Sequence, residues 1–270
     1  MKGLAIITVN YQNYSDTEDF VNSFSKQTNK NYHIYIVDVS TYLEAFPEYK
    51  NVTRIHAENK GYAFGLNTGL TLAQQDGYDK FVFINNDTLV TNDFVDHALT
   101  AVSAHPGSLI GGKIYYAKGY EYHKDRYDKN EVGKVLWYAG GIMDWANAYT
   151  KHRGVDDVDR GQFDKFEETE FVTGCLMCFD NSLIEKVGPL DDKYFLYYED
   201  ADWCARISKA GYHMYYDPSV IIYHKNSQST DGAGSKLHEQ YQEKNRMTFG
   251  LKYAPLRTKL HLLKNAILHS

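Results

Sequence analysis

Short apolar runs alternate with longer amphipathic segments through the first 107 residues of the chain. The short runs predict buried strands, and the segments between them predict helices. The predicted strands are 4–9, 32–37, 53–56 and 80–84, and the predicted helices are 15–26, 61–75 and 92–105. A capping-box sequence, Ser15-Asp-Thr-Glu18, predicts where the first helix begins. This alternation indicates βαβ units that build a largely parallel sheet.

The pattern changes after about residue 108, where Gly, Tyr and charged residues dominate the stretch 111–164. Regular elements return beyond it. The predicted strands of this half are 109–115, 135–143, 170–179 and 220–223, and its predicted helices are 181–188 and 200–210. We therefore predict one continuous α/β domain over residues 1–250, with a Rossmann-like, mixed but mostly parallel sheet flanked by helices, and a helical extension at 251–270.

Charge is distributed unevenly along the chain. The net charge is -6, yet residues 245–270 include five basic residues and no acidic one, which leaves -11 (24 basic minus 35 acidic) for residues 1–244. Such an acidic body argues against nucleic acid as its partner. No stretch reaches the roughly 18 apolar residues that a membrane span needs, and the N-terminal run turns polar too early for a signal peptide. We therefore expect a cytoplasmic protein.

The C-terminal segment has an amphipathic pattern. Its apolar residues at helical spacing are Leu256, Leu260, Leu263 and Ile267, and the basic residues beside them are Arg257, Lys259 and Lys264. This pattern suits a helix that lies on an anionic membrane, as in a peripheral protein on the inner face of the cell membrane. Packing of the same residues on the body of the protein, or on a second copy in a homodimer, is an equal alternative.

The three cysteines, Cys175, Cys178 and Cys204, are too few for a disulfide framework. The first two have C-x-x-C spacing, but they lie in the apolar run 171–179, and the sequence offers no second pair of cysteine ligands. Buried thiols are therefore favoured over a zinc or redox site.

Polar residues end three predicted strands of the first half. They are Thr8 and Asn10 on the first strand, Asp38 on the second, and Asn85-Asn86-Asp87-Thr88 on the fourth. In an open parallel sheet, ligands bind beyond the carboxyl ends of the strands. An aspartate such as Asp38 can accept the hydroxyls of a ribose or the imide of a pyrimidine, and the oxygen-rich segment 85–88 suits a hard divalent cation. A turn-initiating aspartate and an Asx-rich turn are the structural alternatives.

Gly61, Gly65 and Gly69 recur every four residues, so a helix would carry them on one face. Such a face admits either a ligand, with Asn59 and Asn67 nearby, or tight packing on the sheet. No Walker A sequence and no G-x-G-x-x-G follows the first strand, which removes the main support for a kinase or a dinucleotide-binding protein.

The densest polar cluster is Glu199, Asp200 and Asp202, which follows an aromatic run and opens a helix whose dipole favours negative charge. Asp200 and Asp202 cannot share one helical face. One carboxylate that points into a cleft can act as a general base, and the others can cap the helix or pair with Arg206. His224 ends the last predicted strand, where a lone histidine is either structural or a metal ligand.

Taken in order, these segments resemble the family 2 glycosyltransferases with the GT-A fold, and within them the rhamnosyltransferase-like branch. The resemblance covers about residues 3–250. It rests on Ile7-Thr-Val-Asn-Tyr11, Val37-Asp38, Asn59-Lys-Gly-Tyr-Ala-Phe-Gly-Leu-Asn67, Phe83-Ile-Asn-Asn-Asp87, Thr173-Gly-Cys175, Val187-Gly188 with Asp191, Tyr198-Glu-Asp-Ala-Asp-Trp-Cys-Ala-Arg206, Gly211, His224 and Tyr241-x-x-Lys-Asn-Arg246.

The resemblance implies an inverting transfer of a sugar from UDP or dTDP to a saccharide or lipid-linked acceptor, with Mn²⁺ or Mg²⁺, in the synthesis of bacterial cell-surface polysaccharide. It also implies that residues 1–107 bind the nucleotide and residues 108–250 the acceptor. By position in the family's motifs, Asp200 is the expected catalytic base, and Asp87 and His224 are the expected metal ligands. The expected donor contacts are Thr8, Asn10, Asp38, Asn59, Gly61, Asn67, Asn85, Asn86 and Asp87. The expected acceptor contacts are Gly174, Cys175, Glu199, Asp202 and Trp203, with Trp137 as a further aromatic candidate. Near the diphosphate, we expect Lys244 and Arg246.

The sequence departs from the family's full D-x-D motif, because Asn85 and Asn86 precede Asp87. Fewer charges at the metal site imply weak metal binding until the donor diphosphate supplies further ligands.

Three other classes remain as alternatives. A catalytically silent carbohydrate-binding subunit would keep the fold, although the presence of Asp87, Asp200 and His224 together argues against it. A sugar-phosphate nucleotidyltransferase usually carries a Gly-rich loop with Arg or Lys after its first strand, which the segment 10–14 lacks. A glycoside hydrolase also uses paired carboxylates but needs no nucleotide pocket.

Overall fold

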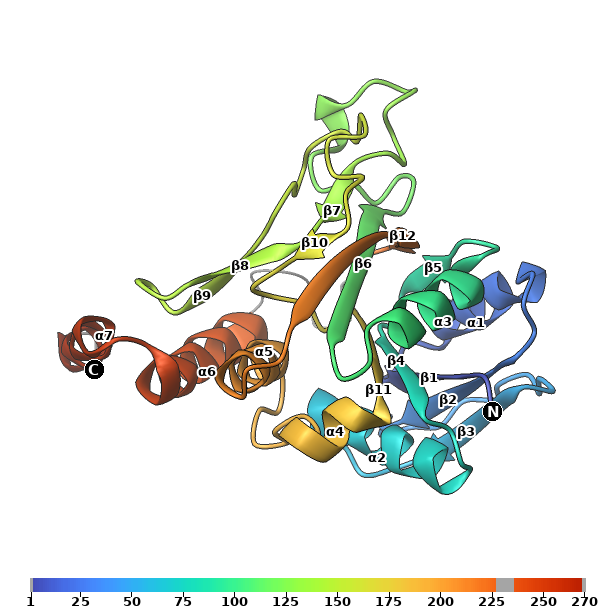
Figure 1. Cartoon of the computed structure of the whole chain (residues 1–270), viewed down its shortest axis with the longest axis horizontal. Coiled ribbons are helices and arrows are strands. Elements are labelled where there is room, and N and C mark those ends of the chain that lie inside the picture. Colours follow the sequence, from blue (N-terminus) through green and yellow to red (C-terminus); the bar gives the residue numbers. More distant parts are fainter. Residues whose placement is uncertain (1, 227–235, 269–270) are drawn as a thin grey trace.

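A computed structural model describes residues 2–226 and 236–268 of the chain (Figure 1). Within these residues, ten strands form one sheet in the order β10-β12-β6-β11-β4-β1-β2-β3, with β5 beside β12 and β7 beside β6, while β8 and β9 form a separate hairpin. The strands are β1 (Leu4–Asn10), β2 (Tyr32–Asp38), β3 (Val52–His56), β4 (Lys80–Ile84), β5 (Thr88–Val90), β6 (Leu109–Tyr116), β7 (Leu136–Tyr138), β8 (Gly141–Asp144), β9 (Tyr149–His152), β10 (Glu167–Glu168), β11 (Leu176–Asp180) and β12 (Met214–His224). The helices are α1 (Tyr14–Ser23), η1 (Phe24–Lys26), α2 (Tyr62–Gln75), α3 (Phe94–Ala104), η2 (Lys124–Arg126), α4 (Asn181–Val187), α5 (Glu199–Lys209), α6 (Lys236–Tyr253) and α7 (Leu256–Leu268).

The predicted parallel half of the sheet is present, since β1 pairs in parallel with β2 and β4, and β2 with β3. The register places Asn10 opposite Asp38, so β1 and β2 end at the same level. Strand β11 runs antiparallel to β4, which places the segment before β11 beside the segment after β4. There the backbone N–H of Asn85 donates to the carbonyl of Cys175 at 3.1 Å. Polar residues from both halves of the chain therefore meet at the edge of the sheet where β4 ends and β11 begins.

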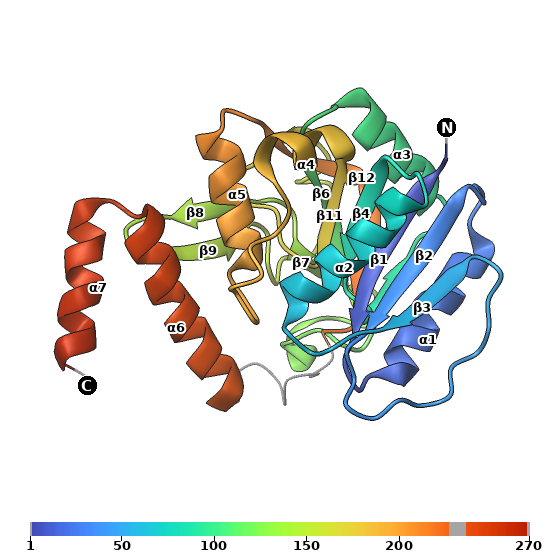
Figure 2. The same ribbon diagram turned by 90° about the horizontal axis from the view of Figure 1, so that it is seen from below.

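Helices cover both faces of the sheet: α1 and α3 lie on one face, and α2, α4 and α5 on the other (Figures 1 and 2). Two glycines of α2 allow that helix to pack closely on β1. A Cβ atom at Gly65 would lie 2.7 Å from a methyl of Val9, and one at Gly69 would lie 2.5 Å from a methyl of Ile7. Tight packing on the sheet therefore explains these two glycines of the predicted glycine face, whereas Gly61 precedes the helix.

Helices α6 and α7 lie together at one end of the molecule, next to the β8–β9 hairpin (Figures 1 and 2). The side chain of Leu262 on α7 packs on Gly250 of α6, and the hydroxyl of Thr258 donates to the carbonyl of Trp145 at 3.0 Å. Helix α6 crosses residue 250, the predicted end of the main domain, and positions 269–270 of the predicted extension lie outside the described residues. Over 2–226 and 236–268, no helix has both the length and the apolar character needed to cross a membrane.

Most predicted elements are confirmed, but several bounds are wrong; the last strand, predicted over 220–223, already begins at Met214. The strand predicted from residue 170 begins only at Leu176, because the preceding loop turns away to hydrogen-bond with Gly141. The strand predicted over 135–143 divides into β7 and β8 at Gly140, where a φ of 93° breaks the extended backbone. Helix α1 begins at Tyr14, so Ser15 lies inside the helix and does not cap it. The buried, unpaired state predicted for the three cysteines is confirmed.

Candidate active site

A cavity of about 940 Å³ opens at the carboxyl ends of β1 and β4 and at the start of α5. Eleven of the residues singled out from the sequence line it: Asn59, Gly61, Asn85, Asn86, Asp87, Trp137, Gly174, Cys175, Glu199, Asp200 and His224. They come from segments that are far apart in the sequence. The structure therefore gathers the expected base, the expected metal ligands and part of the expected donor contacts around one space.

Eight predicted contacts do not line this cavity: Thr8, Asn10, Asp38, Asn67, Asp202, Trp203, Lys244 and Arg246. Thr8 is fully buried within β1, and the amide of Asn67 donates to the carbonyl of Leu190 at 2.9 Å. The guanidinium of Arg246 lies 4.5 Å above the ring of Tyr149.

Asn10 and Asp38 lie behind the wall of the cavity. Successive side chains of an extended segment face opposite sides, so their neighbours Tyr11 and Val39 line the cavity instead. The carboxylate of Asp38 is fully buried and accepts hydrogen bonds from the amide of Asn10 at 3.2 Å and the hydroxyl of Tyr14 at 3.0 Å. In this structure, Asp38 therefore supports the wall from within.

Asp87 and His224 lie side by side because β5 pairs with the end of β12, which places Thr88 opposite His224. An oxygen of Asp87 is 3.2 Å from Nε2 of His224. The other ring nitrogen, Nδ1, is buried and has no hydrogen-bond partner within the described part of the chain. A carboxylate and an imidazole fit Mn²⁺ or a similar divalent ion. No group of three His, Cys, Asp or Glu side chains at metal-binding distance exists among the described residues, so further ligands would have to come from a bound diphosphate or water.

The two asparagines before Asp87 are tied to neighbouring elements. The hydroxyl of Tyr62 donates to the side-chain oxygen of Asn85 at 2.7 Å, and the amide of Asn86 donates to the hydroxyl of Thr17 at 2.7 Å. These bonds fix the turn that presents Asp87. Sequence reasoning missed Tyr62, although it lies within the segment 59–67 that carries the resemblance.

Asp200 stands at the start of α5 and is held by backbone donors. One carboxylate oxygen accepts from the N–H of Gly174 at 2.9 Å, and the other accepts from the N–H of Ala201 at 2.7 Å. Burial raises the pKa of Asp200, and these two hydrogen bonds oppose the shift. A carboxylate can accept about four hydrogen bonds, so Asp200 keeps acceptor capacity for a ligand.

The turn that leads into α5 has a strained backbone. Tyr197 and Tyr198 have φ values of 67° and 72°, in the left-handed region, which costs a non-glycine residue about 1–3 kcal/mol. The buried side-chain amide of Asn245 on α6 donates to the carbonyls of Leu196 and Tyr197 at 2.7 and 3.0 Å. Helix α6 therefore holds the turn that aims Asp200 into the cavity. Asn245 belongs to the segment Tyr241-x-x-Lys-Asn-Arg246 that carries the resemblance, but sequence reasoning assigned it no role.

Glu199 lines the cavity beside Asp200. Burial, together with the nearby charge of Asp200, raises the pKa of Glu199 to about 8. One of its carboxyl oxygens is buried without a hydrogen-bond partner among the residues that the structure describes. This shift favours the protonated form of Glu199, which can donate a hydrogen bond.

This pKa predicts how stability depends on pH. Because the folded chain holds the Glu199 proton up to about pH 8 and the unfolded chain releases it near the ordinary value of 4.5, the free energy of unfolding falls as pH rises between these values. Glu199→Gln keeps a neutral side chain of the same size. We expect this variant to lose less thermal stability than the wild type between pH 6 and pH 9, measured by differential scanning fluorimetry.

Glu48→Gln, at an exposed position, is the matched control and should follow the wild type. Equal loss of stability in Glu199→Gln and the wild type would show that Glu199 is ionised throughout this range.

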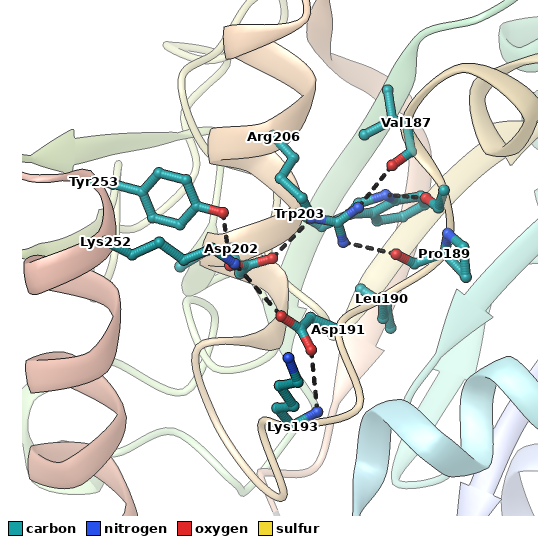
Figure 3. Close-up of polar contacts among 12 residues, drawn as sticks. Val187, Pro189, Leu190, Asp191, Lys193, Asp202, Trp203, Arg206, Lys252 and Tyr253 are labelled. Carbon is teal, nitrogen blue, oxygen red and sulfur yellow. Dashed lines mark hydrogen bonds and ion pairs between the residues drawn. The ribbon is translucent and has the colours of Figure 1, made fainter.

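Asp202 and Trp203 belong to the packing of α5 and not to the cavity (Figure 3). The buried carboxylate of Asp202 accepts from Arg206 at 2.8 Å, as the sequence predicted for one acid of this cluster, and also from Lys252 at 2.7 Å and Tyr253 at 2.8 Å. Trp203 is fully buried, and its ring nitrogen donates to the carbonyl of Gly188 at 2.9 Å. These contacts join α5 to the end of α6 and to the loop after α4.

An aromatic wall lies beside His224. Trp137 lines the cavity, and its ring packs edge-on against His224 at 4.6 Å and against His152 at 4.4 Å between centroids. Burial lowers the pKa of His152 to about 4, so its ring is neutral at pH 7. His152 also lines the cavity, and sequence reasoning missed it because a single histidine in the irregular segment 111–164 gives no pattern.

Comparisons with known proteins identify the family of this chain. A family model described as Glycosyl transferase family 2 matches residues 5–188. Among curated proteins, the chain is 19% identical over 201 residues to "dTDP-rhamnosyl transferase RfbF" of Shigella flexneri, which covers 72% of this chain and 60% of that protein. It is 26% identical over 247 residues to "N-acetylglucosaminyl-diphospho-decaprenol L-rhamnosyltransferase" of Mycobacterium tuberculosis, over 84% of this chain and 77% of that protein.

Two solved structures share the fold. One is GalNAc-T7 with UDP, GalNAc and Mn²⁺, at a TM-score of 0.63 and 14% identity, over 89% of this chain and 48% of that one. The other is the mannosyltransferase PcManGT from Pyrobaculum calidifontis with GDP-Man and Mn²⁺, at a TM-score of 0.54 and 16% identity, over 98% of this chain and 69% of that one. The predicted GT-A fold is confirmed. Because the family model matches most of the chain, the chain belongs to glycosyl transferase family 2, and it is similar to rhamnosyltransferases.

Proposed function

We propose that this glycosyltransferase moves a sugar, with inversion, from a nucleotide diphosphate to a hydroxyl of a saccharide or lipid-linked saccharide. The observation that carries the proposal is that Asp200, Asp87 and His224 line one cavity. Inversion in a single displacement requires a base on one side of the donor sugar and stabilisation of the leaving group on the other. A carboxylate and a metal-binding pair are the groups that this reaction needs.

In the proposed reaction, Asp200 is the general base. Its carboxylate takes the proton of the acceptor hydroxyl, the acceptor oxygen bonds to the anomeric carbon, and the bond from that carbon to the nucleoside diphosphate breaks. The N–H groups of Gly174 and Ala201 hold the carboxylate in place, so little reorganisation is needed when the proton moves. Glu199 lines the same cavity, and its raised pKa favours the protonated form, which in this proposal donates a hydrogen bond to the acceptor.

Asp87 and His224 are the residues that would hold a divalent ion, Mn²⁺ or Mg²⁺. When bound, the ion supplies positive charge for the departing diphosphate. Asn85 and Asn86 fix the turn that carries Asp87 and add no charge, so we expect the diphosphate to complete the metal site.

The names of the relatives suggest the class of substrate. The Shigella flexneri relative is named for dTDP-rhamnose transfer, and the Mycobacterium tuberculosis relative for transfer to a diphospho-decaprenol acceptor. We propose a UDP- or dTDP-linked donor and a lipid-linked or other saccharide acceptor in the synthesis of a bacterial cell-surface polysaccharide. Trp137 is our candidate for stacking on a sugar ring, since it is the tryptophan that lines the cavity.

A thermal-shift screen of UDP, dTDP and GDP, each with and without Mn²⁺, tests the donor and metal parts of the proposal. A ligand that binds the folded chain raises its midpoint of unfolding. We expect a clear rise only when a matching nucleotide and Mn²⁺ are both present. In Asp87→Ala, the loss of one charged ligand should weaken this joint binding by about 10- to 100-fold, as measured by calorimetry.

Asp93→Ala is the matched control, because it removes an exposed carboxylate shortly after β5, the strand that follows Asp87. This variant should bind like the wild type. Unchanged affinity in Asp87→Ala would remove this residue from the metal site. Stabilisation by free glycans alone, with no response to nucleotides, would favour a carbohydrate-binding subunit instead.

A further inference from the structure

Helix α7 carries a stripe of exposed apolar residues. Leu256, Leu260, Leu263 and Ile267 are 73%, 59%, 44% and 76% exposed. At 100° per residue they fall within about 60° of arc on the helix surface, so they form one narrow line along its length. We call these four residues the α7 stripe.

The opposite side of α7 fastens the helix to the protein. Thr258 and Leu262 are buried, and they lie roughly 200° around the helix from the stripe. They contact Trp145 near the β8–β9 turn and Gly250 of α6. The side of α7 that faces its own chain is therefore already packed. Helix α7 lies at the edge of the molecule (Figures 1 and 2), and the four residues of the α7 stripe are exposed there.

Basic residues border the stripe on both sides. Lys259 lies on one side, Arg257 and Lys264 lie on the other, and residues 256–268 contain no acidic residue. Two-fold contact between the stripes of two copies would bring these like charges together, which opposes a symmetric dimer. An apolar line with cationic borders is complementary to a bilayer with anionic headgroups.

We propose that α7 lies in the interface of an anionic membrane, with the α7 stripe among the acyl chains and Arg257, Lys259 and Lys264 at the headgroups. The buried side of α7 contacts the β8–β9 hairpin, whose Tyr149 lines the cavity. Membrane contact at α7 therefore sets the distance of the cavity from the bilayer. The proposed membrane contact does not depend on the proposed sugar transfer, and its test needs neither a sugar donor nor an acceptor.

Co-sedimentation of the full chain with vesicles tests this surface. We expect binding to vesicles of phosphatidylcholine with phosphatidylglycerol, weakened by salt, and much less binding to phosphatidylcholine alone. Leu256→Gln/Leu260→Gln should bind the anionic vesicles at least about tenfold more weakly, because two apolar side chains no longer enter the bilayer. Tyr42→Gln/Leu43→Gln, which removes two exposed apolar side chains from a distant loop, should bind like the wild type.

A second variant, Arg257→Gln/Lys264→Gln, leaves the stripe intact and should lose most of the preference for anionic vesicles. Equal vesicle binding by the wild type and both α7 variants would overturn the proposal. It would also be overturned if light scattering without vesicles showed a dimer that Leu256→Gln/Leu260→Gln converts to a monomer, since a second copy would then cover the stripe.

Discussion

Asp200→Asn should reduce sugar transfer by about 10³-fold while leaving donor binding close to that of the wild type. General base catalysis by a positioned side chain typically contributes 10²–10⁴-fold, and an amide cannot take the proton of the acceptor hydroxyl. Both oxygens of Asp200 accept backbone N–H groups, so the amide nitrogen of the variant must face one of these donors. We therefore also expect a modest loss of stability, on the order of 1 kcal/mol. Transfer of radiolabelled sugar and calorimetry of the donor with Mn²⁺ measure the two effects separately.

Glu199→Gln is the variant to compare with Asp200→Asn. It changes the neighbouring carboxyl group in the same cavity, but a neutral amide resembles the protonated acid that it replaces. We expect it to keep most of its transfer activity at pH 7. The reverse result, with Glu199→Gln inactive and Asp200→Asn active, would move the base to Glu199. If neither variant loses activity, the proton of the acceptor is taken elsewhere.

The position of the site along the chain could be predicted because apolar runs end where the ligand-binding edge begins. The strand predicted over 80–84 is confirmed at both ends, and the Asn85-Asn86-Asp87 segment that follows it lines the cavity. The acids at Glu199 and Asp200 likewise open a helix that starts at the cavity. In an open sheet, the loops that follow the parallel strands lie at the edge where ligands bind.

The direction of each side chain could not be predicted for the first two strands. Strand β1 is buried on both faces, so its sequence has no alternation of apolar and polar residues that would tell which way Asn10 points. The same holds for Asp38 at the end of β2. Both residues lie in the interior, and the neighbouring side chains Tyr11 and Val39 reach the cavity instead.

The direction of the acidic side chains on helix α5 could not be predicted either. Its two aspartates, Asp200 and Asp202, were expected on different faces, but only the packed structure shows that Asp200 faces the cavity and Asp202 faces α6. Contacts of this kind join residues about 50 positions apart in the chain. Local patterns carry no information about them.

On the face of α5 that packs against α6, substitution of Asp202 should have the largest effect on the free energy of unfolding. The carboxylate of Asp202 has no exposed surface and accepts hydrogen bonds from Arg206, Lys252 and Tyr253 (Figure 3). Asp202→Ala leaves all three donors without their shared acceptor. Breaking a buried ion pair costs about 3–5 kcal/mol, and because Arg206 and Lys252 are partly exposed and can regain water, we expect a decrease of about 3 kcal/mol in the free energy of unfolding. Urea unfolding followed by tryptophan fluorescence measures it.

Asp191→Ala provides the matched control for Asp202→Ala, because Asp191 pairs with the same Lys252 at 3.4 Å but is partly exposed (Figure 3). Exposed ion pairs contribute about 0–1 kcal/mol, so this variant should lose less than 1 kcal/mol. Two variants of equal stability would mean that water replaces the contacts of Asp202 as readily as those of Asp191. A large difference would instead identify Asp202 as the residue that ties α5, which carries Asp200, to α6, which holds the Tyr197–Tyr198 turn through Asn245.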